Sequence, residues 1–229
     1  MSSYTNRIED CIMKVPENQL IVASDFYNTY LCDVPETAYY KSLERLSAYG
    51  KLCHLTKGIY CRPKVSRFGV TPISEEQIAS HFTKNNQGII VGYHMYNHYG
   101  ISTQVGKRCE ILTNAISEDQ KTIGSVYLKK INFMLSRERS KSLEALEILQ
   151  GFSSVEDASE DALISYMKKF AISYSDGDMN FILINRKYKK STIAFMEYFL
   201  NMLSVDNSLG KYLSRLSNYK IPVALEAKL

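Results

Sequence analysis

Three helical patterns followed by two short extended runs in the first 67 residues, and a mixed pattern after them, predict an α+β fold. We expect a winged helix-turn-helix domain at 1–67, a linker at 68–74, and at 75–229 a mixed α/β domain with a mostly helical C-terminal part. The chain has 229 residues, of which 45% are hydrophobic and 23% charged, an ordinary composition for a globular protein. A chain of this length buries a core without needing a disulfide or a metal ion.

Apolar spacing and capping residues predict the helices of the N-terminal part. The elements expected in order are a helix at 4–15, a strand at 20–22, a helix at 25–31 that Ser24 caps, and a helix at 36–49. The last of these begins after Pro35 and ends at Gly50, residue types that favour those two positions. One face of this helix carries the residues expected in the core: Tyr39, Ser42, Leu43 and Leu46.

After Gly50 the pattern changes from helical to extended. Two β-prone runs, 52–55 and 59–62, are separated by Thr56-Lys57-Gly58. A three-residue connection that ends in glycine predicts a β-hairpin. Three helices followed by a hairpin is the order of a winged helix-turn-helix, in which the third helix is expected to enter the major groove of DNA and the hairpin to be the wing.

The distribution of charge supports a phosphate-binding face on these elements. The net charge of the whole chain is +4, but residues 1–34 carry two basic and five acidic side chains, whereas residues 35–67 carry seven basic and two acidic ones. A basic segment that coincides with the expected third helix and wing is typical of a nucleic-acid-binding face, and a solvated basic surface is the alternative.

The expected DNA contacts follow from the positions of these residues on the predicted elements. Thr37, Tyr40 and Lys41 are the candidates for contacts in the groove, at the start of the third helix. Lys51, Lys57 and Arg62 are the candidates for phosphate contacts at the wing, which position a protein without reading the base sequence. Arg45 either reaches DNA or pairs with Glu44 or the helix end.

Two blocks of sequence carry a family resemblance. The first is Tyr39-Tyr40-Lys41-Ser42-Leu43-Glu44-Arg45-Leu46-Ser47-Ala48-Tyr49-Gly50-Lys51-Leu52, followed by His54-Leu55-Thr56-Lys57-Gly58-Ile59-Tyr60. The second comprises Gly92-Tyr93, Tyr99-Gly100-Ile101-Ser102-Thr103-Gln104-Val105 and Ile111-Leu112-Thr113-Asn114. Together they resemble the AbiEi family, antitoxin and autorepressor proteins of bacterial abortive-infection operons. The resemblance covers residues 1–135, and Gly106 stands where the family often has proline.

The resemblance implies a function with two parts. The first is sequence-specific binding to double-stranded DNA at the protein's own promoter, with repression of its operon. The second is the role of antitoxin in a toxin–antitoxin system, because family members neutralise a nucleotidyltransferase-like toxin encoded beside them; direct contact with the toxin is left open. One alternative is a ligand-responsive winged-helix regulator without a toxin. The other is a metal-dependent DNA-processing enzyme that uses Asp176, Asp178 and Glu226.

Beyond the expected linker, helices and strands alternate before the pattern becomes helical. Ser74 is expected to cap the first of these helices. The expected strands are 88–91, 109–113, 126–135 and 181–184, and the expected helices are 75–84, 93–99, 138–149, 159–173, 192–203 and 208–218. The run Arg186-Lys187-Tyr188-Lys189-Lys190 is expected either as a solvated turn after the last strand or as a second nucleic-acid contact.

The remaining chemistry-bearing clusters do not predict an active site. His94 and His98 have the spacing of zinc ligands on a helix, but no general-base glutamate lies between them, so we expect packed or hydrogen-bonded histidines. Asp176-Gly177-Asp178 is typical of a tight acidic turn. Glu226-Ala227-Lys228 has the spacing of one nuclease motif, close to the end of the chain. We therefore expect no catalytic residue, no metal and no cofactor, and predict that the protein is not an enzyme.

The sequence also predicts the compartment. The five scattered cysteines are expected to be reduced thiols (Cys11, Cys32, Cys53, Cys61 and Cys109). The sequence contains no run of about 18 apolar residues, so it predicts no membrane-spanning helix. The first residues lead into an amphipathic pattern without a signal-peptide core, so we expect a cytoplasmic protein that has no membrane partner.

Overall fold

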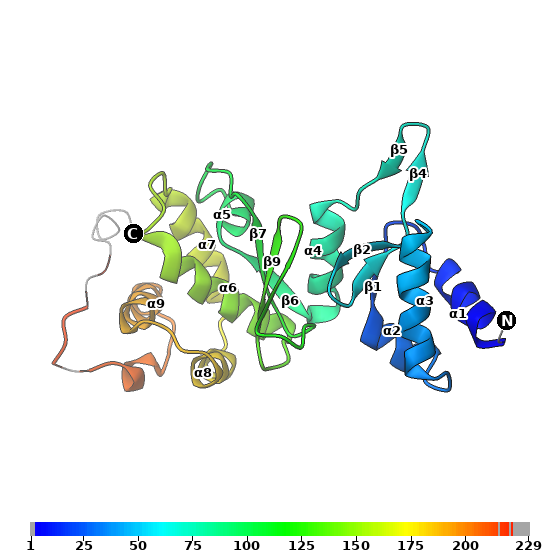
Figure 1. The fold of residues 1–229 in the computed structure, drawn as a ribbon. Helices are drawn as coiled ribbons and strands as arrows, with labels where there is room; N and C mark the ends of the chain where they lie inside the picture. Colours follow the sequence, from blue (N-terminus) through cyan, green and yellow to red (C-terminus); the bar gives the residue numbers. More distant parts are fainter. Residues whose placement is uncertain (1–2, 215, 220, 222–229) are drawn as a thin grey trace. The chain divides into compact units, whose positions relative to one another are not determined.

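The computed structural model describes residues 3–214, 216–219 and 221 and has the predicted α+β architecture (Figure 1). It divides into two compact units. The first comprises Met1–His81 with Thr122–Val126, and the second comprises Phe82–Lys121 with Tyr127–Leu229. No helix in the described part of the chain is both long enough and apolar enough to cross a membrane.

The first unit contains the expected succession of helices and strands. They are α1 (Ser3–Met13), β1 (Leu20–Val22), α2 (Ala23–Tyr30), α3 (Glu36–Ala48), β2 (Cys53–Thr56) and β3 (Ile59–Cys61). Strand β3 pairs antiparallel with both β1 and β2, so the sheet order is β1-β3-β2. The β2–β3 hairpin therefore lies at one side of a small sheet that also includes the strand between α1 and α2.

One apolar core holds these elements together. Helix α3 contributes all four residues predicted for its inner face, since Tyr39, Ser42, Leu43 and Leu46 are buried. The Tyr39 hydroxyl donates a hydrogen bond of 3.1 Å to the carbonyl oxygen of Ala23, which satisfies its polar end inside the core. Gly50 follows the end of α3 with a φ of +67°, a backbone conformation that glycine adopts without strain.

Helix α2 begins differently from the prediction. Its N-cap residue is Val22, the last residue of β1, and Ser24 lies inside the first turn. The Ser24 hydroxyl donates to the carboxylate of Asp25, at 3.1 Å, rather than capping the helix. Strand β1 ends at Val22 and α2 begins at Ala23. The N-cap position therefore belongs to Val22, and Ser24 is already the second residue of the helix.

A second hairpin, which the sequence did not predict, follows the first. It consists of β4 (Lys64–Ser66) and β5 (Gly69–Thr71), which pair antiparallel as a two-stranded sheet. The segment 68–74, expected as a linker, thus contains a strand and lies within the first unit. Gly69 has a φ of +104°, and this conformation lets the chain reverse within two residues.

The chain leaves the first unit through α4 (Glu75–Thr83), which Ser74 caps as predicted. The Gln77 N–H donates to the Ser74 hydroxyl at 3.2 Å, and the Ser74 N–H donates to the Gln77 side-chain oxygen at 3.0 Å. These reciprocal bonds form a capping box. The next elements are η1 (Lys84–Asn86), β6 (Gly88–Val91), α5 (Tyr93–His98), β7 (Cys109–Thr113), β8 (Gln120–Ile123) and β9 (Val126–Lys130).

The four strands after α4 form a sheet in the order β6-β7-β9-β8, and helices follow it. The helices are α6 (Arg137–Phe152), α7 (Glu160–Ile172), α8 (Asp176–Asn185) and α9 (Lys190–Met202), and a 3₁₀ turn, η2 (Leu209–Tyr212), comes after them. A second core joins these helices to the inner faces of β6, β7 and α5. Strand β9 is shorter than the expected strand at 126–135, and β8 was not predicted.

Two predictions for the C-terminal part were wrong. The segment 181–184 is the end of helix α8 and not a strand, and Asp176-Gly177-Asp178 is the first turn of that helix and not a tight turn. The Ser175 hydroxyl caps α8 by accepting from the Asp178 N–H at 3.2 Å. The expected helix at 208–218 is reduced, within the described residues, to the single turn η2.

Candidate nucleic-acid interface

The outer face of α3 carries the three residues predicted to enter a DNA groove. Thr37 and Lys41 are exposed, and no hydrogen bond or ion pair joins either side chain to another described residue. Tyr40 is half-buried, and its ring packs edge-on against the ring of Tyr39 with 5.2 Å between centroids. Because residues three and four apart lie on one face of a helix, these three side chains form a continuous strip.

Lys57 occupies the turn of the β2–β3 hairpin, where the sequence predicted the tip of a wing. Its side chain is exposed and has no ion-pair partner among the described residues. The turn itself is fixed, because the carbonyl oxygen of Gly58 accepts a 2.8 Å hydrogen bond from the N–H of Ala23. A free ammonium group is thus carried on an anchored turn.

Arg45 and Lys51 share one acidic partner on α1. The Arg45 guanidinium lies 3.9 Å from the Glu9 carboxylate, and the Lys51 ammonium donates to the same carboxylate. The predicted partners of Arg45 were Glu44, the helix end or DNA, and the structure instead places Glu9 beside it. Ion pairs that are this exposed contribute about 0–1 kcal/mol, so they are easily exchanged for other anions.

Arg62 has a role within the fold. Its Nη1 donates to the carbonyl oxygens of Met13 and Val15, at 2.7 and 2.5 Å, just where α1 ends. The carbonyl oxygen of Arg62 also accepts from the N–H of Asn18, at 2.8 Å. The last carbonyls of a helix lack partners within the helix, so the guanidinium satisfies groups that otherwise need solvent. The structure therefore uses this predicted phosphate contact to hold α1 against β3.

Two cations that the site prediction did not include extend the basic surface. Lys64 and Arg67 belong to the β4–β5 hairpin, and both are exposed. The sequence contains no Asp or Glu between Glu44 and Glu75, whereas it contains six Lys and Arg residues there. This one-sided composition was visible in the sequence, but the hairpin that carries these two cations was not predicted.

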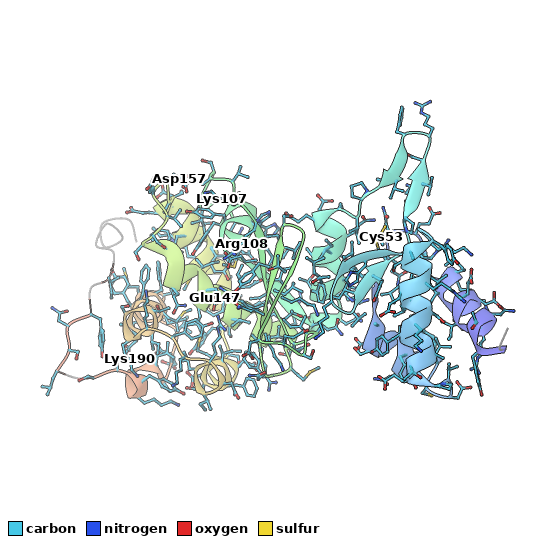
Figure 2. The ribbon with its side chains drawn as sticks, viewed as in Figure 1. Cys53, Lys107, Arg108, Glu147, Asp157 and Lys190 are labelled. Carbon is cyan, nitrogen blue, oxygen red and sulfur yellow. The ribbon has the colours of Figure 1, made fainter. Side chains whose placement is uncertain are left out.

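The second block of the family resemblance has a structural use. The Ser102 hydroxyl donates to the Asp157 carboxylate at 2.7 Å, and the Thr103 N–H and hydroxyl both donate to it at 2.8 Å (Figure 2). These hydrogen bonds favour the charged carboxylate and hold the pKa of Asp157 at about 2. The Ser-Thr pair therefore ties the loop after α5 to the segment that precedes α7.

Asp176 and Asp178, the acidic pair suggested for an enzyme, also make hydrogen bonds and an ion pair within the fold. Asp176 accepts hydrogen bonds from the Tyr174 hydroxyl at 2.8 Å and from the Ser208 hydroxyl at 2.7 Å. Asp178 pairs with the Arg139 guanidinium at 3.2 Å. Both carboxylates thus stabilise the start of α8. Glu226, the third residue of that hypothesis, lies outside the described residues.

His98 and three residues of the basic run 186–190 also make contacts within the fold. The ring of His98 packs edge-on against that of Tyr99, with 4.9 Å between centroids. Residues 186–189 connect α8 to α9, which begins at Lys190, and Arg186 pairs with the Glu147 carboxylate at 3.0 Å (Figure 2). Tyr188 donates to the same carboxylate at 2.6 Å, and Lys190 donates to a main-chain carbonyl. Lys187 and Lys189 remain exposed.

The comparisons with known proteins identify a family without a known function. Residues 7–171 match the model of a family described as "Family of unknown function (DUF6088)". No curated protein matches the chain. Among solved structures, the chain is similar to the RV2827C protein from Mycobacterium tuberculosis, at 13% sequence identity and a TM-score of 0.45, over 88% of this chain and 77% of that one. A likeness this distant supports no statement about function.

Replacing Arg62 by Ala should destabilise the first unit, because two carbonyl oxygens at the end of α1 lose a charged donor. Hydrogen bonds to charged groups contribute about 1.5–3 kcal/mol, so we expect the free energy of unfolding to fall by roughly 2 kcal/mol in urea titrations. Lys57→Ala is the matched control and should change it by less than about 0.5 kcal/mol. Equal stability of the two variants would contradict the structural role of Arg62.

The Asp157 interactions should make stability depend on pH in the acid range. The pKa of Asp157 is about 2 in the folded protein and about 3.9 in an unfolded chain. The stabilisation is therefore complete above about pH 4 and is lost as the pH falls towards 2. We expect Asp157→Asn to be less stable than wild type at pH 7, with a difference that shrinks between pH 4 and pH 2. The exposed Asp206→Asn serves as control, and a difference that stays constant with pH would contradict this assignment.

Proposed function

The chain belongs to DUF6088, a family of unknown function, and we propose that its first unit is a winged helix-turn-helix that binds double-stranded DNA sequence-specifically. The observation that carries this proposal is the outer face of α3, where the exposed side chains of Thr37 and Lys41 have no partner among the described residues, followed by a stretch of chain, 45–74, that contains no acidic residue. The β2–β3 hairpin adds Lys57 on an anchored turn.

The outer face of α3 has the chemistry needed to read bases. The major groove of B-DNA admits an α-helix and presents hydrogen-bond donors, acceptors and thymine methyl groups. Lys41 offers a donor for guanine oxygen and nitrogen, and Thr37 offers a hydroxyl and a methyl group. Tyr40 adds a phenol whose ring is held by Tyr39, so it can contact a base edge with little loss of freedom.

The cations beside the helix would supply affinity rather than specificity. Lys57 is the candidate for a phosphate contact from the wing. Among the described residues, Arg45 and Lys51 pair only with the half-buried carboxylate of Glu9 and are themselves partly exposed, so a phosphate can replace that partner at small cost. Arg62 is not part of this set, because its guanidinium holds the end of α1.

The resemblance to the AbiEi family supports the biological part of the proposal. We propose that the DNA is the promoter of the protein's own operon, that binding represses transcription in the cytoplasm, and that the protein is the antitoxin of a nucleotidyltransferase-like toxin encoded beside it. The proposal gives the second unit the antitoxin role, and the protein itself is not an enzyme. The carboxylates of Asp176 and Asp178 are engaged in hydrogen bonds and an ion pair, so they lend no support to the DNA-processing alternative.

A hollow in the second unit favours one alternative, a regulator that responds to a ligand without any toxin. Its volume is about 860 Å³, and its lining includes Tyr93, Lys107, Arg108, Lys129 and Arg186. Arg108 and Lys129 pair with Glu110, and Arg186 pairs with Glu147, so Lys107 is the lining cation that a small anionic molecule would meet without a carboxylate partner among the described residues. The product of the neighbouring gene distinguishes the two functions. A toxic product that this chain neutralises in co-expression supports the antitoxin role, and a harmless product supports the ligand-responsive regulator.

DNA binding is tested by titrating labelled DNA from the protein's own upstream region, and a scrambled duplex, at two salt concentrations. We expect tighter binding to the upstream DNA with a steep salt dependence. Lys57→Ala should weaken binding to both duplexes about equally and reduce the salt slope by about 1. Lys41→Ala should instead change which sequence is preferred, with a loss of about 1–3 kcal/mol on the preferred site.

The exposed Lys168→Ala, on α7 in the second unit, is the matched control for loss of one positive charge. It should bind both duplexes as wild type does. Equal and weak binding of wild type to the two duplexes would overturn the proposal, and the first unit would then be a protein-contact module. Unchanged sequence preference in Lys41→Ala would remove Lys41 from the reading face.

A further inference from the structure

The hairpin formed by residues 64–71, here named the arm, stands clear of the helices of its unit (Figure 1). Within the part of the chain that the structure describes, its two strands pair only with each other, and all six strand residues are exposed. Residues 67 and 68 form the tip. The Ser66 hydroxyl stabilises this tip by donating to the carbonyl oxygen of Gly69 at 3.0 Å and accepting from the N–H of Phe68 at 3.2 Å.

The arm exposes an amount of apolar surface that has no use inside the fold. Phe68 is 85% exposed at the tip, and the cross-strand pair Val65 and Val70 is 69% and 59% exposed. Residues that are directly opposite in a hairpin project from the same face, so the two valines form one apolar strip. A two-stranded hairpin is only marginally stable by itself, and one that shows apolar side chains to water is typical of a binding element.

The charge on the arm identifies the kind of partner. Lys64 and Arg67 are its two charged residues, and no acidic residue occurs within 45–74. The Arg67 guanidinium lies over the ring of Phe68, 4.6 Å from its centroid. A cation beside an aromatic ring suits a partner that offers both phosphates and flat stacking surfaces, which is the chemistry of nucleic acid.

The base of the arm is fixed to the proposed DNA-binding unit. Only Arg62 and Pro63 separate β4 from the last residue of β3. The guanidinium of Arg62 donates to the carbonyl oxygens of Met13 and Val15, where α1 ends. The ring of Pro63 fixes the φ angle of that residue. The arm is thus an extension of the proposed wing rather than a free loop.

We propose that the arm grips the DNA beside the segment that α3 reads, with its tip in the minor groove. Arg67 enters the groove, where the negative potential attracts arginine, and Phe68 acts as an apolar wedge against a base step. Lys64 contacts a phosphate closer to the base of the arm. A wedge of this kind partly unstacks a step and bends the duplex. The inference rests on the proposed DNA binding by the first unit.

The test uses the full chain and the duplex that wild type prefers, with affinity measured at several salt concentrations and bending measured by energy transfer between end labels. The double variant Lys64→Ala/Arg67→Ala should lower the salt slope by about 2, because two phosphate-region contacts are lost. Phe68→Ala should leave the slope unchanged, weaken binding on the order of 10-fold and reduce the bend. Because these side chains are exposed, we expect the urea unfolding curves of the variants to match that of wild type.

Matched controls come from exposed residues of the second unit. Ile172→Ala removes an apolar side chain that is 89% exposed, and Lys168→Ala/Lys169→Ala removes two exposed charges. Both should bind and bend DNA as wild type does. Arm variants that keep the affinity, salt slope and bend of wild type would overturn the proposal while leaving DNA binding by α3 intact.

Three other outcomes distinguish failure of this inference from failure of the proposed function on which it rests. Failure of wild type to bind any duplex would remove the proposed function itself, and the arm proposal with it. Loss of self-association in Phe68→Ala, seen by sedimentation with unchanged DNA affinity, would make the arm a contact between copies of this chain. Binding of wild type to anionic phosphatidylglycerol vesicles but not to DNA, and its loss in the arm variants, would assign the arm to lipid headgroups.

Discussion

The burial of one face of α3 is the constraint on which the rest of the first unit depends. Tyr39, Leu43 and Leu46 occupy the centre of the core, and the Tyr39 hydroxyl reaches the carbonyl oxygen of Ala23 at the start of α2. Successive side chains of an α-helix are separated by a fixed rotation about its axis. The burial of these residues therefore determines the direction in which the side chains between them point. Thr37 and Lys41 must face outwards because Tyr39 and Leu43 face inwards. The proposed reading face is a consequence of packing.

A basic residue near a binding surface serves either the fold or the ligand, and the structure separates the two uses. Arg62 satisfies two helix-terminal carbonyls, and removing it would expose them unpaired. Lys57 has no protein partner among the described residues, and neither does Lys64. The same segment thus holds one cation that stabilises the wing and others that are available to phosphates. This division explains how the arm can be anchored at its base while its tip stays free.

The sequence predicted those features that depend on local periodicity and failed for those that depend on distant partners. The helices of the first unit and the β2–β3 hairpin were found because apolar spacing and Gly58 are local signals. The pairing of Arg62 with Met13 and Val15 was missed because almost fifty residues separate the partners in sequence. No local pattern marks the end of one helix as the acceptor for an arginine that follows a later strand.

Two further errors concern what apolar residues indicate about structure. The stretch Phe181-Ile182-Leu183-Ile184 is apolar throughout, so its pattern suits a buried strand and a helix equally, and the cap at Ser175 decides for the helix. The arm was missed for the opposite reason, since Val65 and Val70 are exposed and the usual link between apolar residues and burial does not hold there. The apolar residues of a hairpin that binds a partner do not follow the sequence pattern of a buried core.

Cations with a carboxylate partner and exposed cations occur in both units, and the order of charges along the chain distinguishes the two units. In the second unit Arg108, Arg139 and Arg186 each pair with a carboxylate of that unit. In the first unit the corresponding free cations, Lys57 and Arg67, lie in a stretch where the chain supplies no carboxylate. A polyanion gains most from cations that need not leave an existing partner. The uninterrupted run of cations at 45–74 therefore supports the proposal that the first unit binds DNA, and the second unit is then available to a protein toxin or a small ligand.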